Sequence, residues 1–227
     1  MSEQRRRSPR GSGGELGAEV LAAAMALLAE SGDEDAMSVR AVAERVGVSV
    51  PSIYLHFADK QALLNAVCDR VFGDLYAAMQ AAAEGATGPF EALRRQGVAY
   101  VEFAVANPEH YRVVMMRRHA ASDEEYADLA MASGAFAHLV ATVTACISAD
   151  VLRGDPVALA LQLWAAAHGL ASLLVAKPYF PWPELAPLVD QTICMAGLGL
   201  ATHARLDPDW RALPLPDLVA RLDLLGG

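Results

Sequence analysis

Cysteine, aromatic side chains and charge are all scarce in this chain of 227 residues. The three cysteines lie far apart and form no Cys-X-X-Cys pair, which excludes a disulfide-stapled scaffold and the common cysteine-based metal or redox motifs. Aromatic residues make up 7% and charged residues 20%, while small and medium apolar residues, above all alanine, dominate the 54% that is hydrophobic. This composition excludes a disordered chain and favours closely packed helices over sheets.

The sequence patterns of common catalytic and metal sites are also missing. The six histidines show neither His-X-His nor His-X-X-X-His spacing, and no glycine-rich phosphate loop or Gly-X-Ser-X-Gly elbow occurs. The acidic run at residues 33–35 has no recognisable base or nucleophile partner and is most simply a solvated loop. We therefore expect no enzymatic activity, no metal site and no cofactor.

Two segments, 129–149 and 156–176, contain no charged residue and are long enough to cross ~30 Å of hydrocarbon. Polar residues such as His138 and Gln162 interrupt them, and their flanks are mostly acidic, the opposite of the positive-inside pattern. The arginine-rich start followed by apolar residues is a poor signal peptide, because Glu15 and Glu19 fall within the apolar stretch. We expect both segments to be helices buried in a core or a subunit interface of a cytoplasmic protein.

Positive charge is concentrated near the start of an otherwise acidic chain. The protein has 18 basic and 27 acidic residues, for a net charge of −9. Arg5, Arg6, Arg7 and Arg10 lie within residues 1–14, which we predict to form a flexible basic arm. Because the overall charge does not favour a nucleic-acid partner, any contact with DNA must depend on the local placement of basic groups.

Apolar residues recur at helical spacing along the chain, and no segment alternates as a β-strand does, which predicts an all-α fold. Ser38 and Ser49 are suited to cap short helices, Gly47 ends the helix between them, and Ser122 with Glu125 forms a capping box. The predicted helices span about 16–31, 39–46, 49–57, 59–79, 89–106, 155–176, 184–205 and 216–225, with others starting near 108 and 122.

The third of these helices has one buried and one exposed face. Ile53 and Phe57 are four residues apart and can pack on the preceding helix, whereas Pro51 and Leu55 point away from it. Three closely spaced helices over 16–57 form a helix-turn-helix pattern, which presents an exposed helix to the DNA major groove. A three-helix bundle with a purely structural role is the alternative.

Within residues 20–64 the sequence resembles the tetracycline-repressor (TetR) family of bacterial transcription regulators. The resemblance is carried by Ser38-Val39-Arg40, Gly47-Val48-Ser49, Ile53-Tyr54, His56-Phe57, Lys60 and Leu63-Leu64. It implies that recognition-helix residues line the groove while flanking polar and basic groups contact phosphates. Val50 and Pro51 depart from the residues common in the family, so the operator sequence stays open. The DNA-contacting residues expected are Ser38, Arg40, Ser49, Val50, Pro51, Ser52, Tyr54, His56 and Lys60.

A second stretch, Trp164-Ala-Ala-Ala-His168-Gly169, is similar to a TetR subgroup with a Trp-His-Gly signature in its C-terminal domain. Trp164 and His168 are four residues apart, so their rings share one side of a helix, and Gly169 leaves room for another helix. This aromatic pair is either a packed core feature or part of an effector cavity. The cavity residues expected, which favour an apolar or amphipathic effector, are Phe103, Met115, Met116, Phe136, Leu139, Trp164 and His168.

Together these features predict a basic arm (1–14), a helix-turn-helix DNA-binding domain (15–60) and a larger helical domain for effector binding and dimerisation (61–227). We expect a homodimeric repressor that binds a pseudo-palindromic operator, because one recognition helix contacts too few bases for useful specificity. The expected dimer helices lie near 157–176 and 184–205, with Gly197, Ile193 and neighbouring small residues in the interface. The alternative is a helical carrier of a hydrophobic molecule whose helix-turn-helix is vestigial.

Overall fold

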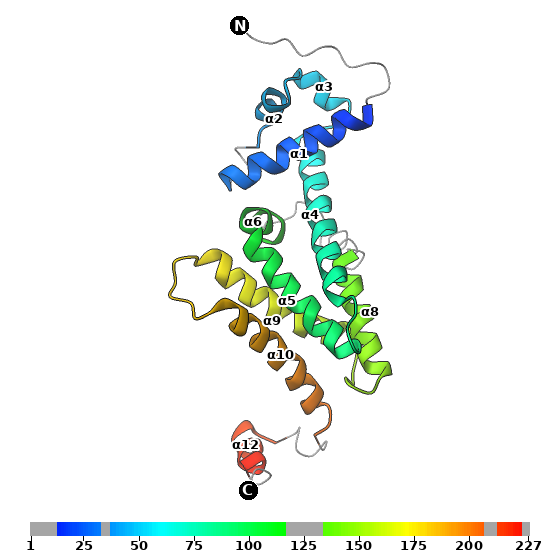
Figure 1. The fold of residues 1–227 in the computed structure, drawn as a ribbon, viewed down its shortest axis with the longest axis vertical. Coiled ribbons are helices and arrows are strands. Elements are labelled where there is room, and N and C mark those ends of the chain that lie inside the picture. The colour runs from blue at the N-terminus through cyan, green and yellow to red at the C-terminus, as the bar shows by residue number, and fades with distance from the viewer. Residues whose placement is uncertain (1–12, 33–36, 117–133, 207–212, 224–227) are drawn as a thin grey trace.

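The computed structural model describes residues 13–32, 37–116, 134–206 and 213–223, and every regular element in these ranges is a helix (Figure 1). The all-α prediction is therefore confirmed for the described part of the chain. The helices are α1 (Gly13–Ser31), α2 (Val39–Val46), α3 (Val50–Tyr54), α4 (Lys60–Ala83), α5 (Pro89–Ala106), α6 (Pro108–Met116), α8 (Gly134–Ser148), α9 (Pro156–Ala176), α10 (Leu185–His203) and α12 (Leu215–Asp223).

Most helix bounds agree closely with the apolar spacing, but α3 is shorter than predicted. It ends at Tyr54 rather than near Phe57, because the amides of both His56 and Phe57 bond to the carbonyl of Ile53 and form a turn. Asp59 then begins α4 by accepting a hydrogen bond from the Ala62 amide at 2.7 Å. The predicted arginine arm and the predicted capping box at Ser122 lie outside the described residues.

The first hydrophobic core joins α1, α2, α3 and the first half of α4. Val20, Leu28, Val42 and Ile53 are almost fully buried in it, together with Leu64 from α4. Two valines of α6, Val113 and Val114, also pack into this core. The N-terminal helices are thus packed on α6 as well as on α4 (Figure 1).

A larger helical bundle contains α5, α8, α9, α10 and the second half of α4. Helix α4 runs from the first core to this bundle (Figure 1): Val67 and Val71 pack with the N-terminal helices, whereas Leu75 and Met79 pack in the second core. One continuous helix therefore belongs to both cores.

Helices α5 and α10 approach each other closely at two glycines. A Cβ atom on Gly97 would lie 2.6 Å from Cγ2 of Ile193, and one on Gly197 would lie 3.1 Å from Cζ of Phe90. The prediction that Ile193 and Gly197 belong to the subunit interface is wrong, because both face α5 within the same chain. Small residues allow the helix approach that the sequence indicates, but within one protomer.

Candidate DNA interface and effector cavity

Helix α2, which precedes α3, is capped at both of its ends by hydrogen bonds. The Ser38 hydroxyl accepts a hydrogen bond from the Ala41 amide at 3.1 Å, which confirms Ser38 as the cap of α2. Gly47 ends this helix in the left-handed region (φ 77°), where glycine is favoured, and its amide bonds to the Ala43 carbonyl at 2.9 Å. Gly47 therefore ends α2 and begins the turn that leads to α3.

The side chains of α3 are divided between a buried and an exposed face. Ile53 is 1% exposed beneath the helix, whereas Leu55 is 83% exposed and Tyr54 48% exposed. Pro51 is exposed as well, while Val50 is half-buried and packs against the first core. The outer face therefore presents Pro51, Tyr54 and Leu55 to solvent, and Val50 only in part.

Ser49 stands at the cap position of α3, but the expected side-chain cap is wrong. Its hydroxyl makes no cap hydrogen bond to the helix backbone and lies 2.8 Å from the hydroxyl of Ser52. The two hydroxyls form an exposed pair on the first turn of the helix. Such a pair offers both donors and acceptors to a phosphate oxygen or a base edge.

His56 is half-buried beside the first helix rather than free in solvent. A Cβ atom on Gly17 of α1 would lie 3.4 Å from Nδ1 of His56, so the imidazole rests against the N-terminal part of α1. No spacing in the sequence indicates this contact, because Gly17 and His56 come together only where α1 passes the turn that follows α3. The ring is held at the edge of the surface that α3 presents.

The two basic residues expected to contact DNA flank α3 along the chain. The Arg40 side chain is 84% exposed, and its Nε donates to Oε1 of Glu44 one turn later at 3.2 Å. Lys60 is the first residue of α4 and is half-buried. An exposed ion pair of this kind is weak, so Arg40 can exchange its partner for a phosphate at little cost.

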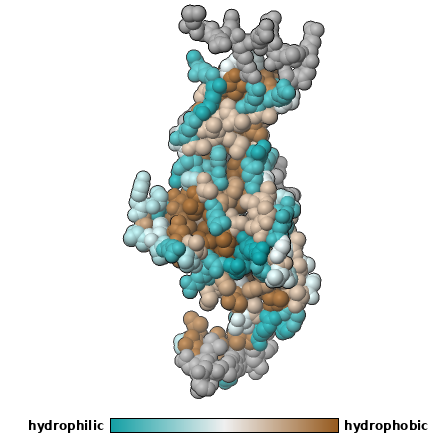
Figure 2. Space-filling model, viewed as in Figure 1, coloured by the Kyte–Doolittle hydropathy of each residue, from teal (hydrophilic) through white to brown (hydrophobic). Residues whose placement is uncertain are grey.

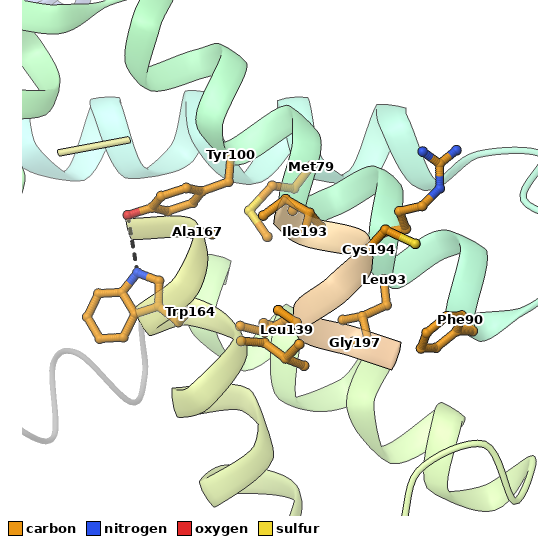
Figure 3. A pocket seen from close by; sticks show the side chains of 14 residues that line it. Met79, Phe90, Leu93, Tyr100, Leu139, Trp164, Ala167, Ile193, Cys194 and Gly197 are labelled. Atoms are coloured by element: carbon orange, nitrogen blue, oxygen red, sulfur yellow. Dashed lines mark hydrogen bonds between the residues drawn. The ribbon is translucent and has the colours of Figure 1, made fainter. Parts of the chain in front are cut away.

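In the larger bundle, Trp164 and His168 share one side of α9, with ring centroids 5.7 Å apart. The Trp164 Nε1–H donates to the Tyr100 hydroxyl at 3.1 Å (Figure 3). His168 Nδ1 lies 2.6 Å from the Tyr111 hydroxyl, and its Nε2 lies 3.3 Å from the hydroxyl of Ser172. Trp164 and His168, four residues apart on α9, thus bond to tyrosines of α5 and α6. Spacing in the sequence alone could not identify these tyrosines.

This network is neutral because it is removed from water. Burial lowers the pKa of the His168 imidazole and raises the pKa of the Tyr100 and Tyr111 hydroxyls. With its proton on Nε2, a neutral imidazole accepts a hydrogen bond from the Tyr111 hydroxyl at Nδ1 and donates one to Ser172. His168 is therefore a hydrogen-bonded residue of the bundle interior.

A cavity of about 40 Å³ lies between α4, α5, α8, α9 and α10 (Figure 3). Of the expected effector residues, Leu139 and Trp164 line it; Phe103, Met115, Phe136 and His168 are not among its lining residues. Phe136 packs edge-on against Trp164, and Phe103 contacts both cores, so these rings fill the protein instead. Met116 is the last residue of α6. Lining residues that the sequence did not indicate include Met79, Phe90, Leu93, Arg94, Tyr100 and Ile193.

Helices α9 and α10 leave an uncharged apolar face uncovered. Leu161 and Leu173 on α9 are 46% and 54% exposed, and Met195 and Leu198 on α10 are 60% and 44% exposed. Gly169 lies on the same side of α9, and no atom of the described residues lies within 4 Å of its Cβ position, so none of the described helices uses the room it leaves. Figure 2 shows hydrophobic surface over this part of the molecule.

By length and composition, α9 and α10 are also both able to cross a membrane. Of the most apolar stretch of 18 residues in each helix, 33% is buried in α9 and 22% in α10. Core and interface helices of soluble proteins pass the same test, and neither helix indicates a membrane protein. Among the residues that the structure describes, no group of three or more His, Cys, Asp or Glu side chains could hold a metal ion.

Comparison with known proteins identifies relatives for both parts of the chain. A model of "bacterial regulatory proteins, tetR family" matches residues 20–67, and a model of the "tetracyclin repressor-like, C-terminal domain" matches residues 93–195. A class A tetracycline repressor of Escherichia coli is 42% identical over 55 residues, which is 24% of this chain and 25% of that protein. An uncharacterized HTH-type transcriptional regulator of Mycobacterium tuberculosis is 34% identical over 97 residues, 40% of each chain. The chain thus matches well under half the length of these curated relatives.

Solved structures extend the likeness in fold over most of the chain. A Rhodococcus protein of unknown function has a TM-score of 0.69 at 26% identity and covers 90% of this chain and 100% of its own. A Rhodococcus regulatory protein of the tetR family has a TM-score of 0.60 at 23% identity, over 81% of this chain and 96% of its own. At such identities the second likeness concerns the fold alone.

Proposed function

We propose that this chain, which two models of the tetracycline-repressor family match over residues 20–67 and 93–195, is a DNA-binding regulator of that family: a dimeric repressor released from its operator by a small apolar or amphipathic effector. The observation that carries the proposal is the two-sided helix α3, anchored by Ile53 and exposed at Tyr54 and Leu55. A short helix supported from beneath in this way fits the major groove.

The DNA contacts proposed combine base and phosphate recognition. Pro51 and the exposed part of Val50 offer apolar contacts to thymine methyl groups, and the Ser49 and Ser52 hydroxyls offer hydrogen bonds. Tyr54, His56, Arg40 and Lys60 flank this surface and suit phosphates, as does the capped N-terminus of α2 at Ser38.

The dimer proposed forms through the uncovered face of α9 and α10. That face carries Leu161, Leu173, Met195 and Leu198 without a charged neighbour on the same stripe of either helix, and Gly169 leaves room for a partner helix. Large exposed apolar surfaces of this kind mark sites of association. A two-fold dimer then presents two copies of α3 to operator half-sites about one helical turn (~34 Å) or a multiple of it apart.

The cavity beside Leu139 and Trp164 is the effector site proposed. At about 40 Å³ it is too small for a drug-sized molecule, so effector binding requires the surrounding helices to move apart. A ligand that favours such an expanded form releases DNA when that form fits the operator poorly. The Trp164-His168-Gly169 pattern supports placing the chain in the Trp-His-Gly subgroup.

Footprinting on the DNA upstream of the protein's own gene tests the proposal. We expect a symmetric protected region from the full chain at moderate salt, and release of that DNA in a screen of apolar and amphipathic compounds. Absence of any DNA shift up to micromolar protein, together with a copurifying lipid, would instead support the alternative of a hydrophobic carrier.

A further inference from the structure

Gln96 on α5 is a buried polar side chain whose hydrogen bonding is incomplete. It is 1% exposed, and its Oε1 has no hydrogen-bond partner among the residues that the structure describes. Buried amide oxygens are normally paired, since an unpaired acceptor forfeits the hydrogen bonds that it makes in water. This oxygen is therefore a place where a further donor is expected.

The other end of the same amide is fully engaged with α8. Gln96 Nε2 lies 2.9 Å from Nε2 of His138 and 3.0 Å from Oγ1 of Thr142. The Thr142 hydroxyl donates to the carbonyl of His138 on its own helix, so its oxygen is the acceptor toward Gln96. Burial lowers the pKa of His138, and a neutral imidazole can accept at Nε2. The amide nitrogen thus faces α8, and the oxygen is left for another partner.

Gln96 also lies one helical turn from the cavity wall. Leu93 and Tyr100, three residues before it and four after it, share its side of α5, and both line the cavity (Figure 3). On α8, Leu139 lines the cavity directly after His138. An occupant that spreads α5 and α8 apart at Leu139 would open the way to Gln96.

The groups around the Gln96 side chain determine which kind of hydrogen-bond donor fits its Oε1. Arg94 at the cavity is already paired with Asp190, and the Tyr76 ring packs edge-on against His138 with centroids 5.2 Å apart. No carboxylate is among the groups described next to the Gln96 amide, so a buried cation would lack a counter-charge, and an anion would face the amide oxygen. A neutral donor is the remaining choice.

We propose that Gln96 Oε1 accepts a hydrogen bond from a neutral hydroxyl or amide N–H of the effector, whose apolar body occupies the cavity beside Leu139 and Trp164. This inference rests on the proposed effector function. It assigns Gln96 as the residue that distinguishes an effector with a donor group from an equally apolar molecule without one.

Two isomeric probes test it: 1-octanol, which carries a hydroxyl donor, and heptyl methyl ether, which has the same atoms but no donor. Isothermal titration calorimetry on the full chain is expected to show about tenfold tighter binding of 1-octanol. In Gln96→Met, which keeps the volume and removes the amide oxygen, we expect the two affinities to become equal through loss of 1-octanol affinity. Gln80→Met, the same change at an exposed position of α4, should keep the tenfold preference.

The outcomes separate this inference from the effector proposal. Equal binding of both probes to the unaltered chain, or an undiminished preference in Gln96→Met, overturns the role of Gln96 and leaves the cavity proposal standing. Binding of neither probe overturns the apolar effector site itself, and the Gln96 inference with it. Gln96→Leu replaces Gln96→Met should the latter not fold, and the comparison on the unaltered chain needs no variant.

Discussion

At the scale of single residues, the surface around α3 depends on exposed groups that are weakly held. Within the described part of the chain, the Arg40 guanidinium is paired only with Glu44 one turn away, and the Ser49 and Ser52 hydroxyls bond to each other rather than to the helix backbone. Contacts of this kind are readily exchanged for phosphate or base contacts. The surface is therefore ready to bind without rearrangement of the core beneath it.

Arg40→Ala and Lys60→Ala are expected to weaken operator binding and to lower the slope of log affinity against log salt by about 1 each, since each removes one phosphate contact. Gel shifts at several salt concentrations measure both quantities. Arg70→Ala is the matched control, because Arg70 is also exposed and paired four residues on, with Asp74, but lies further along α4. An unchanged slope in Arg40→Ala and Lys60→Ala would contradict the assigned contacts.

The interior histidine His168 gives stability a pH dependence of known sign. Burial lowers its pKa from the ordinary 6.5, so the unfolded chain binds a proton at a pH where the folded chain does not. The free energy of unfolding should thus be highest above about pH 6.5 and decrease as the pH falls toward the lower pKa of the folded state.

Urea unfolding between pH 5.0 and 7.5 checks this, and His168→Gln is expected to reduce the decrease. It should not abolish it, because burial also lowers the pKa of His138. The same loss of stability with acid in His168→Gln as in the unaltered chain would show that His168 is not the group responsible.

Residue spacing predicted the two faces of α3, since Ile53 is buried while Pro51 and Leu55 are exposed, as positions on one short helix require. It could not predict partners that come from other elements. The neighbours of His168 lie 57 and 68 residues away on α6 and α5, and those of Gln96 lie more than 40 residues away on α8. The apolar stripe on α9 likewise does not say which side faces a cavity.

At the scale of helices, prolines and capping residues were the sequence signals that predicted helix bounds best. Pro89 and the Asn107-Pro108 pair mark the bounds of α5 as Pro89–Ala106, and the Asp155-Pro156 pair marks the start of α9. The end of α3 carries no such signal, and its last residues form a turn because α4 must begin at Lys60. Helix ends without caps are thus where the sequence prediction failed.

Two glycines in long helices should respond oppositely to the same substitution. In Gly97→Ala the new methyl group would lie 2.6 Å from Ile193 Cγ2, so α5 and α10 must separate, and we expect a loss of about 1–3 kcal/mol in the free energy of unfolding. In Gly73→Ala the new methyl group would have no atom of the described residues within 4 Å, and the higher helix propensity of alanine should raise the free energy of unfolding by up to about 1 kcal/mol.

Urea denaturation of the two variants measures both changes. Ile193→Val combined with Gly97→Ala is expected not to restore stability, because Val keeps a branched Cβ, whereas Ile193→Ala combined with Gly97→Ala should relieve the contact. Gly97→Ala as stable as the unaltered chain would show that α5 and α10 are not closely packed at this point.

At the scale of the whole molecule, the proposed dimer depends on the uncharged face of α9 and α10. Leu173→Glu places a charge on this face and is expected to shift the proposed dimer to monomer and to weaken operator binding more than tenfold, since a single α3 then binds each half-site alone. Sedimentation equilibrium and gel shifts measure these effects.

Val105→Glu is the matched control for this change. Val105 is an apolar residue of α5 with 40% exposure, outside the proposed interface, so its replacement should leave both the dimer and operator binding intact. A dimer that persists in Leu173→Glu would place the interface elsewhere.

Helix α4 has a geometric consequence for signalling between the two cores. Its 24 residues form a rod ~36 Å long. The C-terminal half of this rod packs in the larger helical bundle, and its N-terminal end begins with Lys60, shortly after α3. A tilt of about 5° at the C-terminal end of α4 moves its N-terminal end by about 3 Å, which is roughly the length of a hydrogen bond. In the proposed dimer, a modest widening of the small cavity would thereby move the two copies of α3 out of register with the pitch of the double helix.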